Sequence, residues 1–138
     1  MLDRERILAK IAELDSYLGE LKQVTPATFD AYQAIEKKRS CERLLQLCIE
    51  SVIDVCKMLV SGLKLGLPSD ENDLFSKLHA KKIISEETAG TLREMKGLRN
   101  ILIHEYATFD DEIVYSYAKR NINDFEEFKK QILASISS

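Results

Sequence analysis

Hydrophobic side chains recur at helical spacing along most of the chain. Between residue 3 and about residue 23 they step by four and three positions, which predicts one apolar stripe on a charged helix: Ile7, Ile11, Leu14, Leu18, Leu21. A second helical stretch runs from residue 28 to about 64, and the Lys37-Lys38-Arg39-Ser40 cluster is where a break would fall. Beyond Arg43 apolar residues surround this stretch, so we expect it at the centre of the fold.

The rest of the chain also favours helices. A short helix capped by Asp70 or Asn72 should reach about His79, and Ser85, followed by two glutamates, should start a helix that ends near residue 104. Residues 111 to about 120 are expected to be helical, although alternating apolar positions leave a strand as an alternative. A last helix begins at about residue 123. We therefore expect one all-α domain over residues 1–138, a bundle of five or six helices.

Composition narrows the class of protein. The chain has 138 residues, 45% hydrophobic and 31% charged, which is typical of a globular domain. The first residues are charged and show no leader pattern, so we expect a cytoplasmic protein that does not contact a membrane. With a net charge of −3, any RNA must be bound by a local basic pocket rather than by long-range attraction.

The three cysteines lie on one predicted helix, about two turns apart. Cys41, Cys48 and Cys56 are then separated by roughly 10 Å, too far for a disulfide within that helix. The sequence has no Cys-x-x-Cys pair and no histidine near these cysteines, so it gives no sign of a metal site there. We expect reduced cysteines in the core.

Only two histidines are available for acid–base chemistry near neutral pH. His79 is expected at the surface, at the end of a short helix. His104 follows Arg99 and Asn100 and precedes Tyr106, so four polar groups of distinct chemistry stand within eight residues. On an ideal helix Asn100 lies nearly on the face of His104, and Arg99 on that of Tyr106.

Arg99 and His104, however, point about 140° apart on an ideal helix. They can act on one atom only if the helix unwinds near His104 or if a twofold dimer brings in a second copy. Such a cleft would suit RNA cleavage, with histidine taking the proton of the ribose 2′-OH and arginine holding the phosphate, and would require no metal. Alternatively, Arg99 caps backbone carbonyls and His104 is an ordinary residue at a helix end.

The segment Arg99-Asn100-x-x-x-His104-x-Tyr106 resembles the R-x4-H-x-Y motif of HepT-type HEPN toxins, which often have a polar residue after the arginine. The likeness extends in order over roughly residues 40 to 133. It implies a homodimeric HEPN helical bundle that acts as a metal-independent endoribonuclease. Arg99 and His104 would be the catalytic pair in the cleft between subunits, with Asn100 in support.

The resemblance also implies a partner and a means of control. Toxins of this family are paired with an MntA-like nucleotidyltransferase antitoxin, which uses ATP and Mg²⁺ to transfer AMP to the motif tyrosine, here Tyr106. The toxin itself would need no cofactor. Because Tyr106 shares a helix face with Arg99, an adenylate there would add negative charge beside the phosphate site.

Two further sets of residues are candidates for supporting roles. Glu50 and Asp54, one turn apart on the central helix, could orient Arg99, although their spacing also fits a solvated polar stripe. Arg93 and Lys96, within two turns of Arg99, are preferred over the Lys37–Arg39 cluster for guiding RNA. The rival function is a non-catalytic HEPN adaptor that binds nucleotide or docks a nucleotidyltransferase.

Overall fold

The computed structural model describes residues 2–104 and 110–137, which fold into seven helices and contain no strand. The helices are α1 (Arg4–Val24), α2 (Phe29–Tyr32), α3 (Ile35–Gly62), α4 (Glu71–Ala80), α5 (Glu86–Ile103), α6 (Asp111–Arg120) and α7 (Ile122–Ile136). The prediction of an all-helical bundle is confirmed. The expected count of five or six helices was too low, because α2 is separate from α3.

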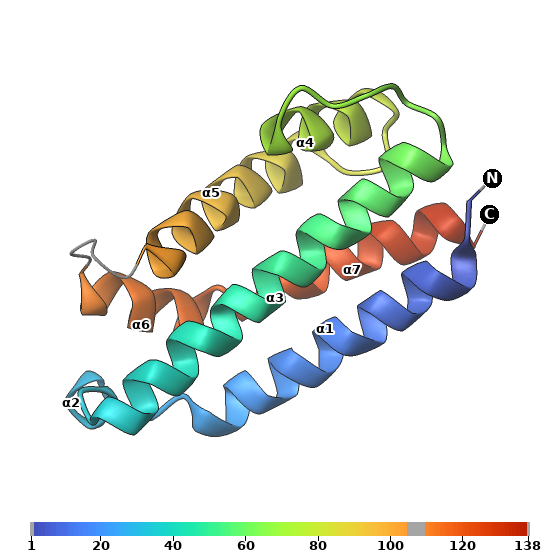
Figure 1. Ribbon diagram of the computed structural model, residues 1–138. Helices are drawn as coiled ribbons and strands as arrows, with labels where there is room; N and C mark the ends of the chain where they lie inside the picture. Colours follow the sequence, from blue (N-terminus) through green and yellow to red (C-terminus); the bar gives the residue numbers. More distant parts are fainter. Residues whose placement is uncertain (1, 105–109, 138) are drawn as a thin grey trace.

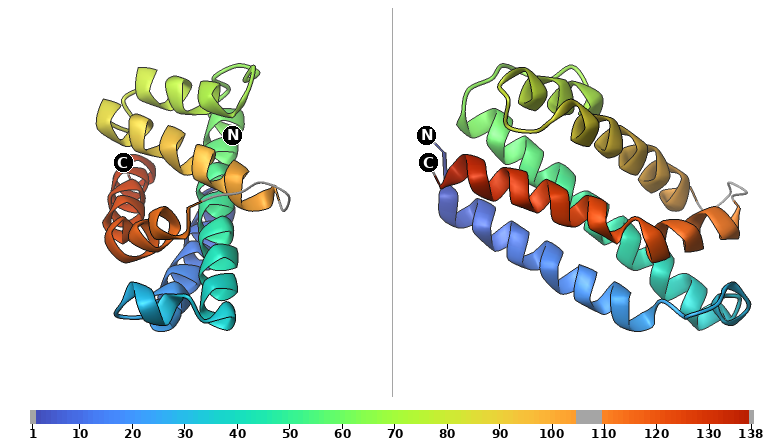
Figure 2. Two further views of the ribbon diagram at one scale, coloured as in Figure 1. Left: turned by 90° about the vertical axis from the view of Figure 1, so that its left-hand side faces the viewer. Right: turned by 180° about the vertical axis from the view of Figure 1, so that it is seen from behind.

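Helix α3 is the centre of the bundle, as its apolar circumference predicted. In Figure 1, α1 runs antiparallel to α3 on one side, and α4 and α5 lie along the other. The view from behind shows α7 between α1 and α5, where it closes the rear of the molecule (Figure 2). Eleven residues of α3 are buried: Cys41, Leu45, Cys48, Ile49, Ser51, Val52, Ile53, Val55, Cys56, Leu59, Val60.

The break in the second helical stretch lies before the basic cluster rather than within it. Ala34 has extended backbone (φ −60°, ψ 129°) and separates α2 from α3. The cluster itself stays helical because ion pairs offset its charge: Lys38 Nζ lies 2.8 Å from Asp111 Oδ2, and Arg39 Nη1 lies 2.8 Å from Glu42 Oε1.

Side-chain caps begin the helices on which the motif depends. Asp70 accepts a hydrogen bond from the Asp73 amide at 2.8 Å and starts α4, and Ser85 accepts one from the Thr88 amide at 3.1 Å and starts α5. Both caps were predicted. The strand alternative for residues 111–120 is wrong, because this segment forms helix α6, which begins at a cap where Asp110 accepts a hydrogen bond from the Glu112 amide at 2.9 Å.

The three cysteines are free and buried along α3, as predicted. Burial raises the pKa of the Cys48 thiol to about 12, so it stays protonated near neutral pH. None of the described helices combines the length and the apolar content needed to cross a lipid bilayer.

The packing of α1 on α3 leads to a test of stability. Leu14 is fully buried, whereas Leu8 on the same helix is 46% exposed. We expect Leu14→Ala to lower the free energy of unfolding by about 2–5 kcal/mol, because it leaves a cavity in the core. Leu8→Ala is the matched control. Urea denaturation checks both variants, and an equal effect of the two would contradict the assigned register of α1.

Candidate functional site

Arg99 lies in the last two turns of α5 and is fixed by two side chains. Its Nη2 donates to Glu71 Oε1 in an ion pair, and its Nε donates to Asn100 Oδ1 at 3.0 Å. The Arg99 side chain is only 14% exposed, so its charge is partly removed from water. The Glu71 carboxylate offsets much of this desolvation cost. The guanidinium is therefore held in one orientation at the edge of the bundle.

The position of Glu71 follows from the packing of α4 on α5. Glu71 is the first residue of α4, next to the capping residue Asp70, where the helix dipole favours an acid. Leu74 and Leu78 of α4 and Leu92 of α5 are buried in the common core, which holds the two helices together. This packing brings Glu71 to Arg99 across 28 positions of sequence.

The contacts to Arg99 leave part of the guanidinium for a ligand. An arginine has five N–H groups, and the bonds to Glu71 and Asn100 use two of them. The other three have no acceptor within residues 2–104 and 110–137. Such a planar, permanently charged donor set suits bidentate binding of a phosphate.

His104 stands where the helix has already ended. Helix α5 ends at Ile103, and His104 is its C-terminal cap, with φ −90° and ψ 90° and an N–H that donates to the Ile101 carbonyl at 3.3 Å. The residue is exposed. The ψ of 90° redirects the residues that follow His104 rather than its own Cβ, so the wide angle between Arg99 and His104 expected from helical spacing stays a prediction.

The motif tyrosine, Tyr106, lies outside the described residues, together with its neighbours from 105 to 109. Its relation to Arg99 remains a prediction from the sequence. His79, the other histidine, is exposed near the end of α4, as predicted.

The two acids nominated from the sequence are engaged elsewhere. Asp54 pairs with Lys10 of α1, at 3.6 Å between Oδ2 and Nζ, and Glu50 accepts a hydrogen bond from Gln46 Nε2 at 2.9 Å. The carboxylate that contacts Arg99 is Glu71, which the sequence analysis missed. An acid in the first turn of a helix is a visible signal, but many helices carry one.

The basic residues expected to guide RNA lie upstream on α5. Arg93 is exposed and its Nη2 donates to Ser76 Oγ at 3.3 Å, while Lys96 is half-buried. In the alternative cluster, Lys38 and Arg39 are already in ion pairs. The structure thus leaves Arg93 the more exposed cation near the motif.

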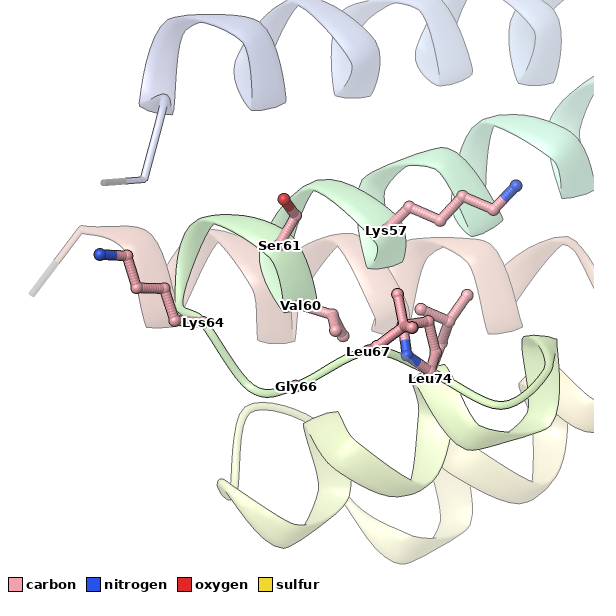
Figure 3. Close-up of a pocket in the computed structure, with 8 residues that line it drawn as sticks. Lys57, Val60, Ser61, Lys64, Gly66, Leu67 and Leu74 are labelled. Atoms are coloured by element: carbon pink, nitrogen blue, oxygen red, sulfur yellow. The ribbon is translucent and has the colours of Figure 1, made fainter.

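A hollow of about 490 Å³ lies at the far end of α3, away from the motif. The residues that line it are Lys57, Val60, Ser61, Lys64, Gly66, Leu67, Pro68 and Leu74. Figure 3 shows the lysine side chains Lys57 and Lys64 extending away from each other, so their ammonium groups do not converge on one ligand. Within the described part of the chain, no group of three or more His, Cys, Asp or Glu side chains is arranged to hold a metal ion.

Comparisons with known proteins cover nearly the whole chain. A family model described as "Ribonuclease HepT-like" matches residues 14–132. The mRNA nuclease HepT of Shewanella oneidensis is 30% identical over 122 residues, 88% of this chain and 92% of the relative. The tRNA nuclease HepT of Aphanizomenon flos-aquae is 29% identical over 127 residues, 91% of this chain and 86% of the relative.

Solved structures with a similar fold come from the same group of proteins. A solved structure of a tri-AMPylated Shewanella oneidensis HEPN toxin in complex with an MNT antitoxin superposes with a TM-score of 0.86 and 30% sequence identity. The superposition covers 93% of this chain and 96% of that toxin. Sequence and structure therefore point to one family.

Proposed function

The chain belongs to the HepT-like ribonuclease family, and from this we propose that it is the RNase toxin of a toxin–antitoxin pair. The observation that carries the proposal is the arrangement at the end of α5. There a guanidinium fixed by Glu71 and Asn100 is followed, five residues later, by an exposed histidine. The relatives include an mRNA nuclease and a tRNA nuclease, so RNA is the proposed substrate and the cytoplasm the proposed place of action.

The proposed chemistry uses the ribose as the internal nucleophile. His104 accepts the proton of the 2′-OH, O2′ forms a bond to the adjacent phosphorus, and the bond from phosphorus to O5′ breaks. A second histidine or water protonates the leaving oxygen. Arg99 donates to the non-bridging phosphate oxygens, whose negative charge increases in the transition state. This scheme needs no metal ion.

A homodimer would supply the second histidine. Support comes from exposed apolar side chains next to the motif: Ile101 and Ile103 are each 43% exposed, and Ile113 at the start of α6 is 61% exposed. Covering β-branched residues of this kind is favourable, and a twofold interface would place both His104 residues in one cleft.

We further propose that an MntA-like nucleotidyltransferase antitoxin silences this chain by transferring AMP from ATP to Tyr106. The tri-AMPylated relative bound to its antitoxin supports the reaction type. Tyr106 stands two residues after His104 in the sequence, so each adenylate would add negative charge close to the phosphate site. Arg93 and Lys96 would guide RNA along α5 toward Arg99.

The histidines provide a matched test of catalysis. We expect His104→Ala and Arg99→Ala each to lower the rate of RNA cleavage by about 10²- to 10⁴-fold, because each removes a group that acts on the reacting phosphate. His79→Ala should cleave at the wild-type rate. Cleavage is measured by gel analysis of purified protein with EDTA present, and folding by circular dichroism.

Expression of the wild type or His79→Ala should arrest growth, whereas expression of His104→Ala or Arg99→Ala should not. Equal toxicity of the wild type and His104→Ala would favour the non-catalytic adaptor instead. Loss of wild-type cleavage in EDTA, restored by one divalent metal, would overturn metal independence.

The ion pair of Arg99 with Glu71 predicts a positioning role for that acid. Glu71→Ala should reduce kcat by about 10-fold or more, because the guanidinium loses its orientation. The kcat of Glu71→Gln should lie between those of the wild type and Glu71→Ala, because its amide oxygen can still accept a hydrogen bond from Arg99. KM should not rise in either variant, since removing an acid favours phosphate binding. Glu50→Gln is the control with unchanged kcat, and unchanged kcat in both Glu71 variants would refute the role.

Tyr106 can be tested as the modified residue. Incubation with the cognate nucleotidyltransferase, ATP and Mg²⁺ should add adenylate mass to the wild type and to Tyr17→Phe, but none to Tyr106→Phe, because the phenol oxygen is the acceptor. Intact-protein mass spectrometry measures the addition. Adenylate mapped to another tyrosine would disprove this assignment.

A further inference from the structure

A groove of about 520 Å³ lies where α2 meets α6, and it has no part in the chemistry described above. Its lining comes from both helices and the segment before α2: Ala27, Thr28, Phe29, Glu112, Tyr115, Ser116, Lys119, Arg120. The two helices lie at the same end of the molecule as the end of α5, the one that carries the motif (Figures 1 and 2). The volume is within the usual range for small-molecule sites.

The contribution of α6 forms one continuous face. Positions 112, 115, 116, 119 and 120 recur at helical spacing, while Val114 and Ala118 are buried on the opposite side. Glu112 and Arg120 are about 12 Å apart along the helix axis. The groove is therefore long enough to place different parts of one ligand against different side chains.

The middle of the groove is aromatic and firmly held. The Phe29 and Tyr115 rings are 5.8 Å apart at 55°, and Tyr115 is also 5.1 Å from the buried Tyr32. The Tyr115 hydroxyl donates to the Pro26 carbonyl at 2.8 Å, which fixes the ring. Partly exposed aromatic rings that cannot rotate away are platforms on which nucleobases stack.

One end of the groove is cationic. Lys119 and Arg120 are exposed, and neither forms an ion pair with any described residue. Aromatic rings beside unpaired cations match a nucleotide better than they match a purely apolar ligand, because the base and its phosphate need both. A protein partner held by an apolar surface would not need the two charges.

We propose that this groove binds one unpaired nucleotide of the RNA substrate, with its base against Phe29 and Tyr115 and its phosphate at Lys119 and Arg120. The inference rests on the proposed RNase function and adds a substrate subsite on α6. Lys38 ties the start of α6 to α3 through Asp111, so the groove has a fixed position in the bundle.

The test of the cations uses a matched pair of double variants. Lys119→Gln with Arg120→Gln removes two charges at the end of α6, and Lys81→Gln with Lys82→Gln removes two exposed charges just after α4. Both are made in the His104→Ala background, so that a fluorescent single-stranded RNA stays intact during anisotropy titrations over a range of salt concentrations.

We expect the α6 pair to weaken RNA binding and to lower the slope of log K against log salt by about 0.7, the value for one phosphate contact on a single strand. The Lys81 and Lys82 pair should change both quantities much less. An equal effect of the two pairs would overturn the proposal, because it would indicate general attraction rather than a site.

The aromatic contacts are tested by photocrosslinking. RNA containing 5-iodouridine, irradiated with the His104→Ala protein, should crosslink to peptides containing Phe29 or Tyr115, as found by mass spectrometry. Crosslinks only elsewhere would refute the site, and so would loss of antitoxin binding in the α6 pair with RNA binding unchanged. Crosslinking of 5-iodouridine monophosphate to the same peptides would support the groove even if the wild type cleaves no RNA, so the two proposals can fail separately.

Discussion

Burial of α3 is the constraint on which the rest of the structure depends. Apolar side chains surround this helix, so one neighbouring helix cannot cover it. Helix α1 lies along one side and α4 and α5 along the other, and α7 then fills the space between α1 and α5. The hydrophobic free energy of these contacts fixes the positions of polar groups that have no strong preference of their own.

The Arg99–Glu71 pair is one consequence of that packing. A charged side chain as enclosed as Arg99 would be costly without a carboxylate, and α4 supplies one because its first turn is packed against α5. The same pair that makes the position tolerable also orients the guanidinium. Stability and the proposed function are therefore coupled at Arg99, whereas His104 is exposed at the end of its helix.

The α2–α6 groove, with its aromatic and basic side chains, is also a consequence of packing between helices. Lys38 joins α3 to the start of α6, and Tyr115 joins α6 to the segment before α2 through the Pro26 carbonyl. These contacts hold α2 against α6 and leave a groove between them, in a protein whose net charge is −3. Binding of a polyanion by such a chain requires locally concentrated cations rather than an overall positive field.

The sequence by itself determined the helices, their caps at Asp70 and Ser85, the central place of α3, the buried cysteines and the motif around Arg99 and His104. These features depend on local periodicity and on residues close in the chain, which is why they could be read without a structure. Three features could not be read from the sequence: the break before Ile35, the partner of Arg99 and the α2–α6 groove. Glu71 and Arg99 are 28 positions apart, and the carboxylates nominated from the sequence were instead Glu50 and Asp54. Glu50 bonds to Gln46 one turn earlier on α3, and packing places Asp54 beside Lys10 of α1. Which of several similar carboxylates meets a given cation depends on how helices are arranged in space, and that arrangement is a property of the whole core rather than of any one segment.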